Sequence, residues 1–347
     1  MDYLVCQDWE NTTNNHAGMK HMANLLKFNS PDNYKVYIFA DRLGNKKRNF
    51  WGRIEWQACT KVINPASYFL FAIYLVNQIK KGDRVFLLEY MEKVTPQNRI
   101  AEVIKKLKPE VKVLGLVHLT PSVLENAFTQ SEIQNWTFAV DNVITMGSSL
   151  SSYFVKRGVP QSKISTLFHY VDLEYYKNLK YRSSHNDRII VIAMGNQKRN
   201  YNILSEIIKA NPNVSFVVCK GVSDIDHIFN GYSNVKLVGF VCEDKLKELM
   251  QEADISLNVM DDTIGSNVIT TSIAMGLAMI VSDVGSIRDY CKEDGAIYCN
   301  NDDVSSFSNA IRLLDADRDR LDRLKRASLD RSHIFSVRHF HTCLKHL

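Results

Sequence analysis

The feature that most restricts the fold of this chain is a regular alternation of short apolar runs with helical segments. Between two such runs, Ile100, Val103, Ile104 and Leu107 follow the i, i+3, i+4, i+7 spacing of an amphipathic helix. Strands joined by helices can pair in parallel, so the alternation predicts α/β architecture with parallel sheets. The strand-like runs are 35–40, 84–90, 111–119, 138–146 and 164–171, then 189–195, 214–221, 235–241, 254–260, 278–285 and 296–299.

The alternation is interrupted once, at 173–188, where the apolar period is lost and charged residues, Ser and Asn accumulate. A chain of 347 residues with 45% hydrophobic content is long enough for two cores. We therefore expect two Rossmann-like domains, 1–172 and 189–332, joined by the linker 173–188. Residues 333–347 should form a terminal helix that could return to the first domain.

Composition excludes several classes of protein. The seven cysteines show no C-x-x-C pair, which argues against a zinc site or a disulfide framework. The first residues lack the regions of a signal peptide, which favours a cytoplasmic location. The apolar stretch 68–76 is about half of the ~20 residues that span a membrane, so we expect a buried helix. A net charge of +5, spread along the chain, does not indicate nucleic acid but is compatible with weak attraction to anionic lipid.

Two stretches of the second series are candidates for binding an anion. Ligands of parallel sheets bind at the carboxyl ends of strands, and helix N-termini accept phosphate. Gly265, Ser266 and Asn267 form a small polar turn before a helix, although Ser266 or Asn267 could equally be a helix cap. Lys198 and Arg199 follow the strand 189–195, where cations could neutralise a departing diphosphate or be merely solvated.

Four stretches together resemble one family, the GT-B glycosyltransferases, and in particular the large retaining group related to sucrose and polysaccharide glycosyltransferases. They cover roughly residues 139–300, and their order and spacing match the family. The stretches are "VDNVITMGSSLSSYFVKRGVPQSKISTLFHYVDLEYY", "MGNQKRNYNIL", "VKLVGFVCEDKLKELMQEADI" and "ADISLNVM" with "GSNVITTSIAMGLAMIVSDVGSIRDY".

The resemblance implies two domains facing a cleft, with the donor held by the second domain and the acceptor by the first. Arg199 matches a lysine of the family, and Lys198 could stand in for its arginine. Val241 lies where the family holds the nucleotide base through the main chain.

In the first domain, the resemblance places His118 beside the donor sugar, although a lone histidine there could equally be structural. Gly18 would allow close approach of the donor. His16 would face the acceptor side of the cleft. An ordinary loop and helix cap is the alternative for "NNHAGMKHM".

One departure from the family pattern concerns an E-x7-E pair, whose two glutamates fall here on Thr263 and Thr271. In the family the second glutamate binds the ribose. A threonine hydroxyl at 271 could still form one hydrogen bond there, without the charge assistance of a carboxylate.

The resemblance implies transfer of a sugar from a nucleoside diphosphate sugar to an acceptor hydroxyl, with retention and without a metal or other cofactor. The acceptor would be a glycan or a lipid-linked molecule of surface polysaccharide synthesis, with peripheral contact to the inner membrane face. An epimerase of the same fold and a non-catalytic sugar-nucleotide-binding subunit are the alternatives. A dinucleotide dehydrogenase is opposed by the absence of G-x-G-x-x-G after the first strand.

Overall fold

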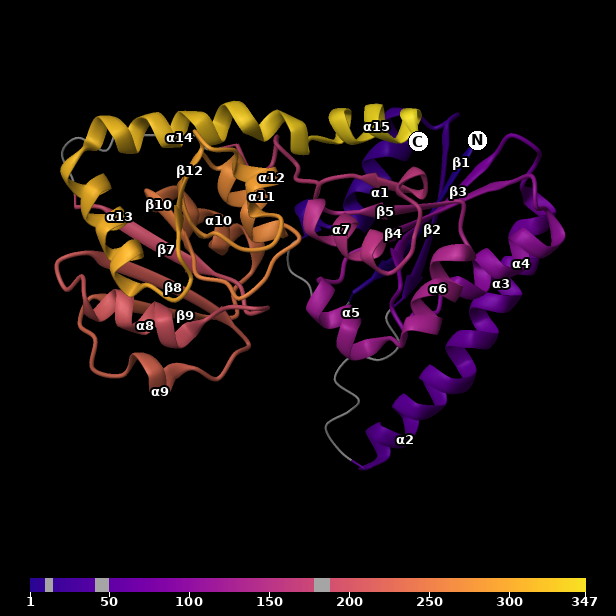
Figure 1. Ribbon diagram of the computed structural model, residues 1–347, viewed down its shortest axis with the longest axis horizontal. Helices are drawn as coiled ribbons and strands as arrows, with labels where there is room; N and C mark the ends of the chain where they lie inside the picture. Colours follow the sequence, from indigo (N-terminus) through magenta and orange to yellow (C-terminus); the bar gives the residue numbers. More distant parts are fainter. Residues whose placement is uncertain (10–14, 41–49, 178–187) are drawn as a thin grey trace. The chain divides into compact units, whose positions relative to one another are not determined.

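The computed structural model describes residues 1–9, 15–40, 50–177 and 188–347, which form two compact units (Figure 1). Unit 1 comprises Met1–Leu167 and Cys343–Leu347, and unit 2 comprises Phe168–Thr342. Most of the predicted linker, residues 178–187, lies outside the described residues.

Unit 1 is built on a six-stranded parallel sheet with the order β2-β1-β3-β4-β5-β6. Asp2 of β1 lies opposite Tyr34 of β2 and Arg84 of β3, so β1 is an internal strand next to the edge strand β2. Strands buried on both faces are expected to read as continuous apolar runs, as β3 and β4 do. The strands are β1 (Asp2–Asp8), β2 (Tyr34–Ala40), β3 (Arg84–Tyr90), β4 (Lys112–Val117), β5 (Asn142–Thr145) and β6 (Ile164–Thr166).

Helices connect these strands and flank the sheet of unit 1 (Figure 1). They are α1 (Met19–Asn29), α2 (Phe50–Ala58), α3 (Asn64–Gln78), α4 (Asn98–Leu107), α5 (Pro121–Ala127), α6 (Gln130–Phe138) and α7 (Ser148–Lys156). The predicted strand 138–146 begins too early, because α6 extends to Phe138. A capping box fixes the start of that helix: Thr129 Oγ1 accepts from the Glu132 amide, and Glu132 accepts from the Thr129 amide.

The helix predicted at 68–76 is present, but the prediction that it is buried is wrong for one of its faces. A π-helical segment, η3 (Cys59–Ile63), joins α2 to α3, so that Phe50–Gln78 is one helix of 29 residues along the side of unit 1 (Figure 1). By length and composition it is apolar enough to cross a membrane, but only 28% of its most apolar window is buried. Tyr68, Ala72 and Leu75 face the interior, whereas Phe69, Leu70 and Ile73 are exposed.

Unit 2 contains a second six-stranded parallel sheet, with the order β12-β11-β10-β7-β8-β9. Its core includes Val191, Phe216, Leu257, Ile280 and Phe307, all buried. The strands are β7 (Ile190–Met194), β8 (Ser215–Gly221), β9 (Val235–Gly239), β10 (Ile255–Asn258), β11 (Ala278–Ser282) and β12 (Ala296–Cys299).

The helices of unit 2 follow the strands in turn, and α14 runs over this unit in yellow (Figure 1). Lys325 of α14 lies 3.3 Å from Asp254 at the start of β10, and both side chains are buried. The helices are α8 (Tyr201–Lys209), α9 (Asp226–Phe229), α10 (Glu243–Glu252), α11 (Asn267–Ala274), α12 (Ile287–Cys291), α13 (Val304–Ala316), α14 (Arg318–Ser332) and α15 (Val337–His346). The end of α15 belongs to unit 1, where Arg84 Nη1 donates to the Leu344 carbonyl at 2.8 Å.

Candidate functional site

The candidate site lies where the strand order of unit 2 reverses. From β7 the chain adds β8 and β9 on one side, and then β10, β11 and β12 on the other. Such a switch point leaves a crevice at the carboxyl ends of the two strands on either side of the reversal. Here these strands are β7, ending at Met194, and β10, ending at Asn258.

The loops after β7 and β10 are bonded to each other. Arg199 and Met260 form an antiparallel bridge. The Asn200 amide donates to the Val259 carbonyl at 3.1 Å, and the Asp261 amide donates to the Lys198 carbonyl at 3.0 Å. Lys198 has φ of 52°, in the left-handed region that non-glycine residues seldom adopt. Paired backbones therefore fix the predicted cationic residues in place.

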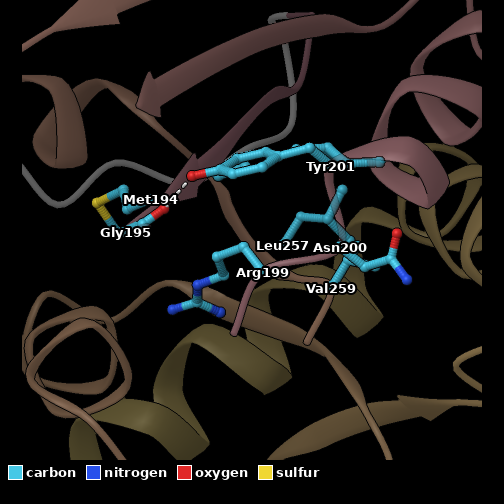
Figure 2. Close-up of a pocket in the computed structure, with 9 residues that line it drawn as sticks. Met194, Gly195, Arg199, Asn200, Tyr201, Leu257 and Val259 are labelled. Carbon is cyan, nitrogen blue, oxygen red and sulfur yellow. Dashed lines mark hydrogen bonds between the residues drawn. The ribbon is translucent and has the colours of Figure 1, made fainter. Parts of the chain in front are cut away.

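The same loop is also tied to the start of α8. Asn200 caps this helix, its Oδ1 accepting from the Ile203 amide at 3.1 Å, while its Nδ2 donates to Asp261 at 3.0 Å. The Tyr201 hydroxyl donates to the Gly195 carbonyl at 2.8 Å, as the dashed line in Figure 2 shows. The small pocket in Figure 2, about 10 Å³, has room for a single water molecule, so a nucleotide could only bind outside it.

Arg199 is half-buried and incompletely hydrogen-bonded. Its Nη1 donates to Asn258 Oδ1 at 3.2 Å, but its Nε, enclosed by protein, has no hydrogen-bond partner among the described residues. Burial lowers the pKa of the guanidinium to about 10, against a smaller opposite effect of Tyr201, so the group remains a cation at neutral pH. No carboxylate in the described ranges forms an ion pair with it. An enclosed cation of this kind is suited to an anionic ligand.

Beside Gly195, the start of α11 lies close to Arg199. Its φ is 87°, and a Cβ placed on it would lie 3.2 Å from Val268 and 3.3 Å from Nε and Nη2 of Arg199. The first amides of a helix have no partner within the helix and carry partial positive charge. The structure therefore brings Lys198 and Arg199 to the same edge of the sheet as Ser266 and Asn267.

The turn before α11 depends on glycine for its shape. Gly265 has φ of 90°, and a Cβ there would overlap the ring of the fully buried Tyr290. The Gly265 amide donates to Thr263 Oγ1 at 3.0 Å, so in this conformation it already has a partner. The Thr263 carbonyl accepts from the Ser286 amide at 2.8 Å. Thr263, where the family pattern has its first glutamate, therefore supports the turn.

The other predicted residues of α11 are placed by the helix itself. Ser266 is the N-cap, and its Oγ accepts from the Ile269 amide at 3.4 Å. Asn267 is the first helical residue and is half-buried. Thr271 follows one turn later, is buried, and donates from Oγ1 to the Val268 carbonyl at 3.2 Å. A ligand could reach its hydroxyl only as a donor to the remaining lone pair. Val241 lies two residues after β9, at the outer edge of the sheet.

The remaining predicted residues belong to unit 1. His118 follows β4, and its Nε2 lies 2.8 Å from the Leu88 carbonyl, which can only accept. Burial lowers the pKa of the ring to about 4, so it is neutral at pH 7. Gly18 is the N-cap of α1 with φ of −89°, which other residues also adopt. His16 packs its ring on that of His21, with centroids 4.7 Å apart.

Sequence reasoning missed three residues that shape the site. Asn258 orients Arg199, and Tyr290 lies under Gly265. Gly285, with φ of 57°, has no room for a Cβ against the Thr263 carbonyl. Asn258 could have been noticed as a polar residue ending an apolar run. The packing of Tyr290 on Gly265 leaves no pattern in the sequence, because tertiary structure alone brings these residues together.

Comparison with known proteins gives one family match, to part of unit 2, and similar solved structures for the whole chain. Residues 190–317 match the family model described as glycosyl transferases group 1. No curated protein matches the sequence. Solved structures similar to the chain include HepE of Anabaena in complex with UDP and glucose, with a TM-score of 0.68 and 11% identity over 99% of this chain and 98% of HepE.

Two further solved structures are similar. Sucrose-phosphate synthase of Thermosynechococcus elongatus has a TM-score of 0.71 and 13% identity, covering 100% of this chain and 98% of that one. The lipopolysaccharide outer core galactosyltransferase WaaB has a TM-score of 0.66 and 12% identity, covering 96% and 99%. The predicted α/β class with two Rossmann-like domains is confirmed. Residues 190–317 of unit 2 are thus similar to the group 1 glycosyl transferases, and the chain has the GT-B fold.

Proposed function

We propose that this protein transfers a sugar from a nucleoside diphosphate sugar to an acceptor hydroxyl. The observation that carries the proposal is Arg199, an enclosed cation without a carboxylate partner among the described residues, at the switch point of the sheet. HepE, similar in fold, was solved with UDP and with UDP-glucose. A uridine diphosphate sugar is therefore the first donor to test.

In the proposed reaction, the bond between the sugar C1 and the diphosphate oxygen breaks, and a bond forms from the acceptor oxygen to C1 on the same face. The leaving phosphate oxygen takes the acceptor proton, so the configuration is retained. Negative charge grows on the diphosphate, and Arg199, Lys198 and the N-terminus of α11 would stabilise it. These residues supply positive potential of the kind that a divalent metal supplies in other transferases.

The class of acceptor molecule is taken from the family resemblance. We propose a glycan or a lipid-linked acceptor of surface polysaccharide synthesis, in the cytoplasm. His118 of unit 1, neutral at pH 7 and bonded to the Leu88 carbonyl, could offer a ligand a hydrogen bond but not a proton.

A non-catalytic, sugar-nucleotide-binding role is the second candidate. The observation that favours it is the engagement of both threonines that replace the glutamates: Thr263 bonds the Gly265 amide and Thr271 the Val268 carbonyl. Incubation with UDP-sugars, with and without glycan acceptors, followed by chromatography of the products separates the two. Transfer supports an enzyme, whereas tight nucleotide binding with intact donor supports a silent subunit.

We expect nucleotide binding to be insensitive to chelators. UDP at about 100 times its Kd should stabilise the protein by ~2.7 kcal/mol, and the rise in melting temperature should be equal with and without EDTA. The positive potential comes from Arg199, Lys198 and a helix terminus, none of which EDTA removes. Abolition of the shift by EDTA, and its recovery with Mg²⁺ or Mn²⁺, would show that a metal belongs to the site.

The ribose contact can be tested by a matched pair of valine substitutions. Thr271→Val and Thr270→Val each delete a buried hydroxyl of α11 that donates to a helix carbonyl, Val268 for one and Ser266 or Asn267 for the other. If Thr271 accepts from the ribose, Thr271→Val alone should weaken UDP binding, by ~0.5–1.5 kcal/mol. Calorimetric titration measures this difference. Equal affinities in the two variants would remove Thr271 from the site.

A further inference from the structure

The helix Phe50–Gln78 of unit 1 carries a concentrated exposed apolar surface. Of the eighteen large apolar side chains exposed among the described residues, nine belong to this helix. Trp51 is 76% exposed, Leu70 66% and Val62 65%. They are too clustered to be the scattered surface residues of an ordinary domain. We call this the apolar stripe: Phe50, Trp51, Ile54, Val62, Ile63, Phe69, Leu70, Ile73 and Tyr74.

The spacing of the exposed residues in the second half of the helix makes the stripe continuous. Val62, Phe69, Leu70 and Ile73 stand at i, i+7, i+8 and i+11, which places them on one face. The opposite face is also apolar and is buried in unit 1. A helix that is apolar all round is normally covered on every side, whereas the described residues of unit 1 leave this face open.

The charged residues in the helix and at its ends are mostly positive, and the first acid after it, Asp83, accepts from the Lys80 amide at 2.8 Å. No charged residue occurs from Val62 to Ile79, and exposed lysines stand at both ends of this stretch: Lys61 before it, and Lys80 and Lys81 after it. Arg53 is exposed further upstream, and Glu55 is the one acid from Phe50 to Lys81. None of the four cations forms an ion pair in the described part of the chain. An apolar face bounded by lysines matches a surface that is apolar within and anionic at its boundary.

We propose that the apolar stripe lies in the plane of an anionic lipid bilayer, with its side chains at the boundary of headgroups and acyl chains and its lysines on lipid phosphates. This inference stands independently of sugar transfer. Length and composition would also allow the helix to span a membrane. However, Tyr68 donates to Gln7 at 2.9 Å and Asn64 to the Val94 carbonyl at 2.8 Å. Spanning would break both bonds and expose the core of unit 1, whereas lying flat keeps them.

A second copy of the chain would cover the apolar stripe less favourably than a bilayer, because of the same lysines. In a two-fold symmetric pair the helix meets itself. Antiparallel packing about the centre of the uncharged stretch 62–79 would place Lys61 of one copy beside Lys80 and Lys81 of the other, and parallel packing would place each lysine beside its equivalent. Either arrangement brings like charges together at the rim of an apolar contact. An anionic bilayer neutralises those charges instead.

Flotation with lipid vesicles tests the proposal. We expect the full chain to float with vesicles of 70% phosphatidylcholine and 30% phosphatidylglycerol, and far less with phosphatidylcholine alone. Val62→Glu/Leu70→Glu, at two exposed positions, should lower the partition coefficient roughly tenfold or more. Lys80→Glu/Lys81→Glu should lower it on anionic vesicles by a similar factor. Val222→Glu, at a valine of unit 2 that is 75% exposed, is the matched control and should change nothing.

Three outcomes contradict the proposal. They are failure of the wild type to float with either vesicle, equal flotation of Val62→Glu/Leu70→Glu with circular dichroism unchanged, and a dimer in light scattering that this double variant abolishes while vesicles have no effect. A blue shift of tryptophan emission on adding anionic vesicles, lost in Trp51→Phe, gives an independent positive result, because Trp51 is in the stripe.

Discussion

Arg199→Ala is expected to lower the rate of sugar transfer by on the order of a hundredfold or more, with little change in the melting temperature. The guanidinium would stabilise charge that develops on the leaving diphosphate, and loss of one such contact typically has an effect of this size. Its contribution to folding is small by comparison, because it forms one side-chain hydrogen bond, to Asn258, and is partly desolvated. Rates from initial-velocity assays and melting temperatures from calorimetry measure the two effects separately.

Two further variants sharpen this test. Arg199→Lys keeps the charge but cannot keep both the bond to Asn258 and the position of Nε, so we expect an intermediate rate. Arg326→Ala removes an exposed arginine of α14 and should leave the rate unchanged. A rate for Arg199→Ala within a fewfold of the wild-type rate would show that Arg199 does not take part in the chemical step. A large fall in its melting temperature would make its role structural.

Gly265→Ala is expected to destabilise unit 2 by ~2–5 kcal/mol. The left-handed conformation at φ of 90° costs an alanine ~1–2 kcal/mol. The new methyl group would also overlap the ring of Tyr290, and such overpacking adds ~1–3 kcal/mol. Because Tyr290 packs on Phe335, with parallel rings 5.4 Å apart, it has little freedom to move away. Urea unfolding, followed by far-ultraviolet circular dichroism, measures the loss.

Gly231→Ala is the control that separates the two costs. Gly231 has nearly the same φ, 89°, but no atom within 4 Å of a new Cβ. It should therefore lose only the ~1–2 kcal/mol of conformational strain. Equal losses in the two variants would mean that the Tyr290 ring yields at no cost, and that the turn is held by its conformation alone.

The sheets were largely predictable because their strands are parallel and buried. A strand covered on both faces is apolar throughout, and its position can be found without knowing its partners. The ends of strands were less predictable. The run 278–285 continues past Ser282, where β11 ends, because Val284 and Gly285 belong to the turn that supports Thr263. Apolar character alone does not distinguish a strand from the buried turn that follows it.

The charged residues of the candidate site could be predicted, but the residues that hold them and the neighbouring turn in place could not. Lys198 and Arg199 could be found because they follow a strand of the second domain. In a parallel sheet, ligands bind at the carboxyl ends of the strands. Asn258 contacts Arg199 and Tyr290 contacts Gly265, and because these partners are far apart in the sequence, the sequence alone does not show the contacts. The exposure of the helix Phe50–Gln78 was missed for another reason: when a helix is apolar on all faces, its periodicity does not say which face the core takes.

The contacts of Arg199 also constrain how this chain can vary over evolution. Gly195 leaves room for the guanidinium, and Asn258 accepts from it. A side chain at 195 would crowd the arginine, and an apolar residue at 258 would leave a second N–H of a buried cation without an acceptor. We therefore expect the residues at 199 and 258 to vary together. In relatives that keep arginine at 199, we expect position 258 to keep a side-chain oxygen, and relatives with lysine at 199 should be free of that requirement, whereas glycine at 195 should be retained in both because of its φ of 87°.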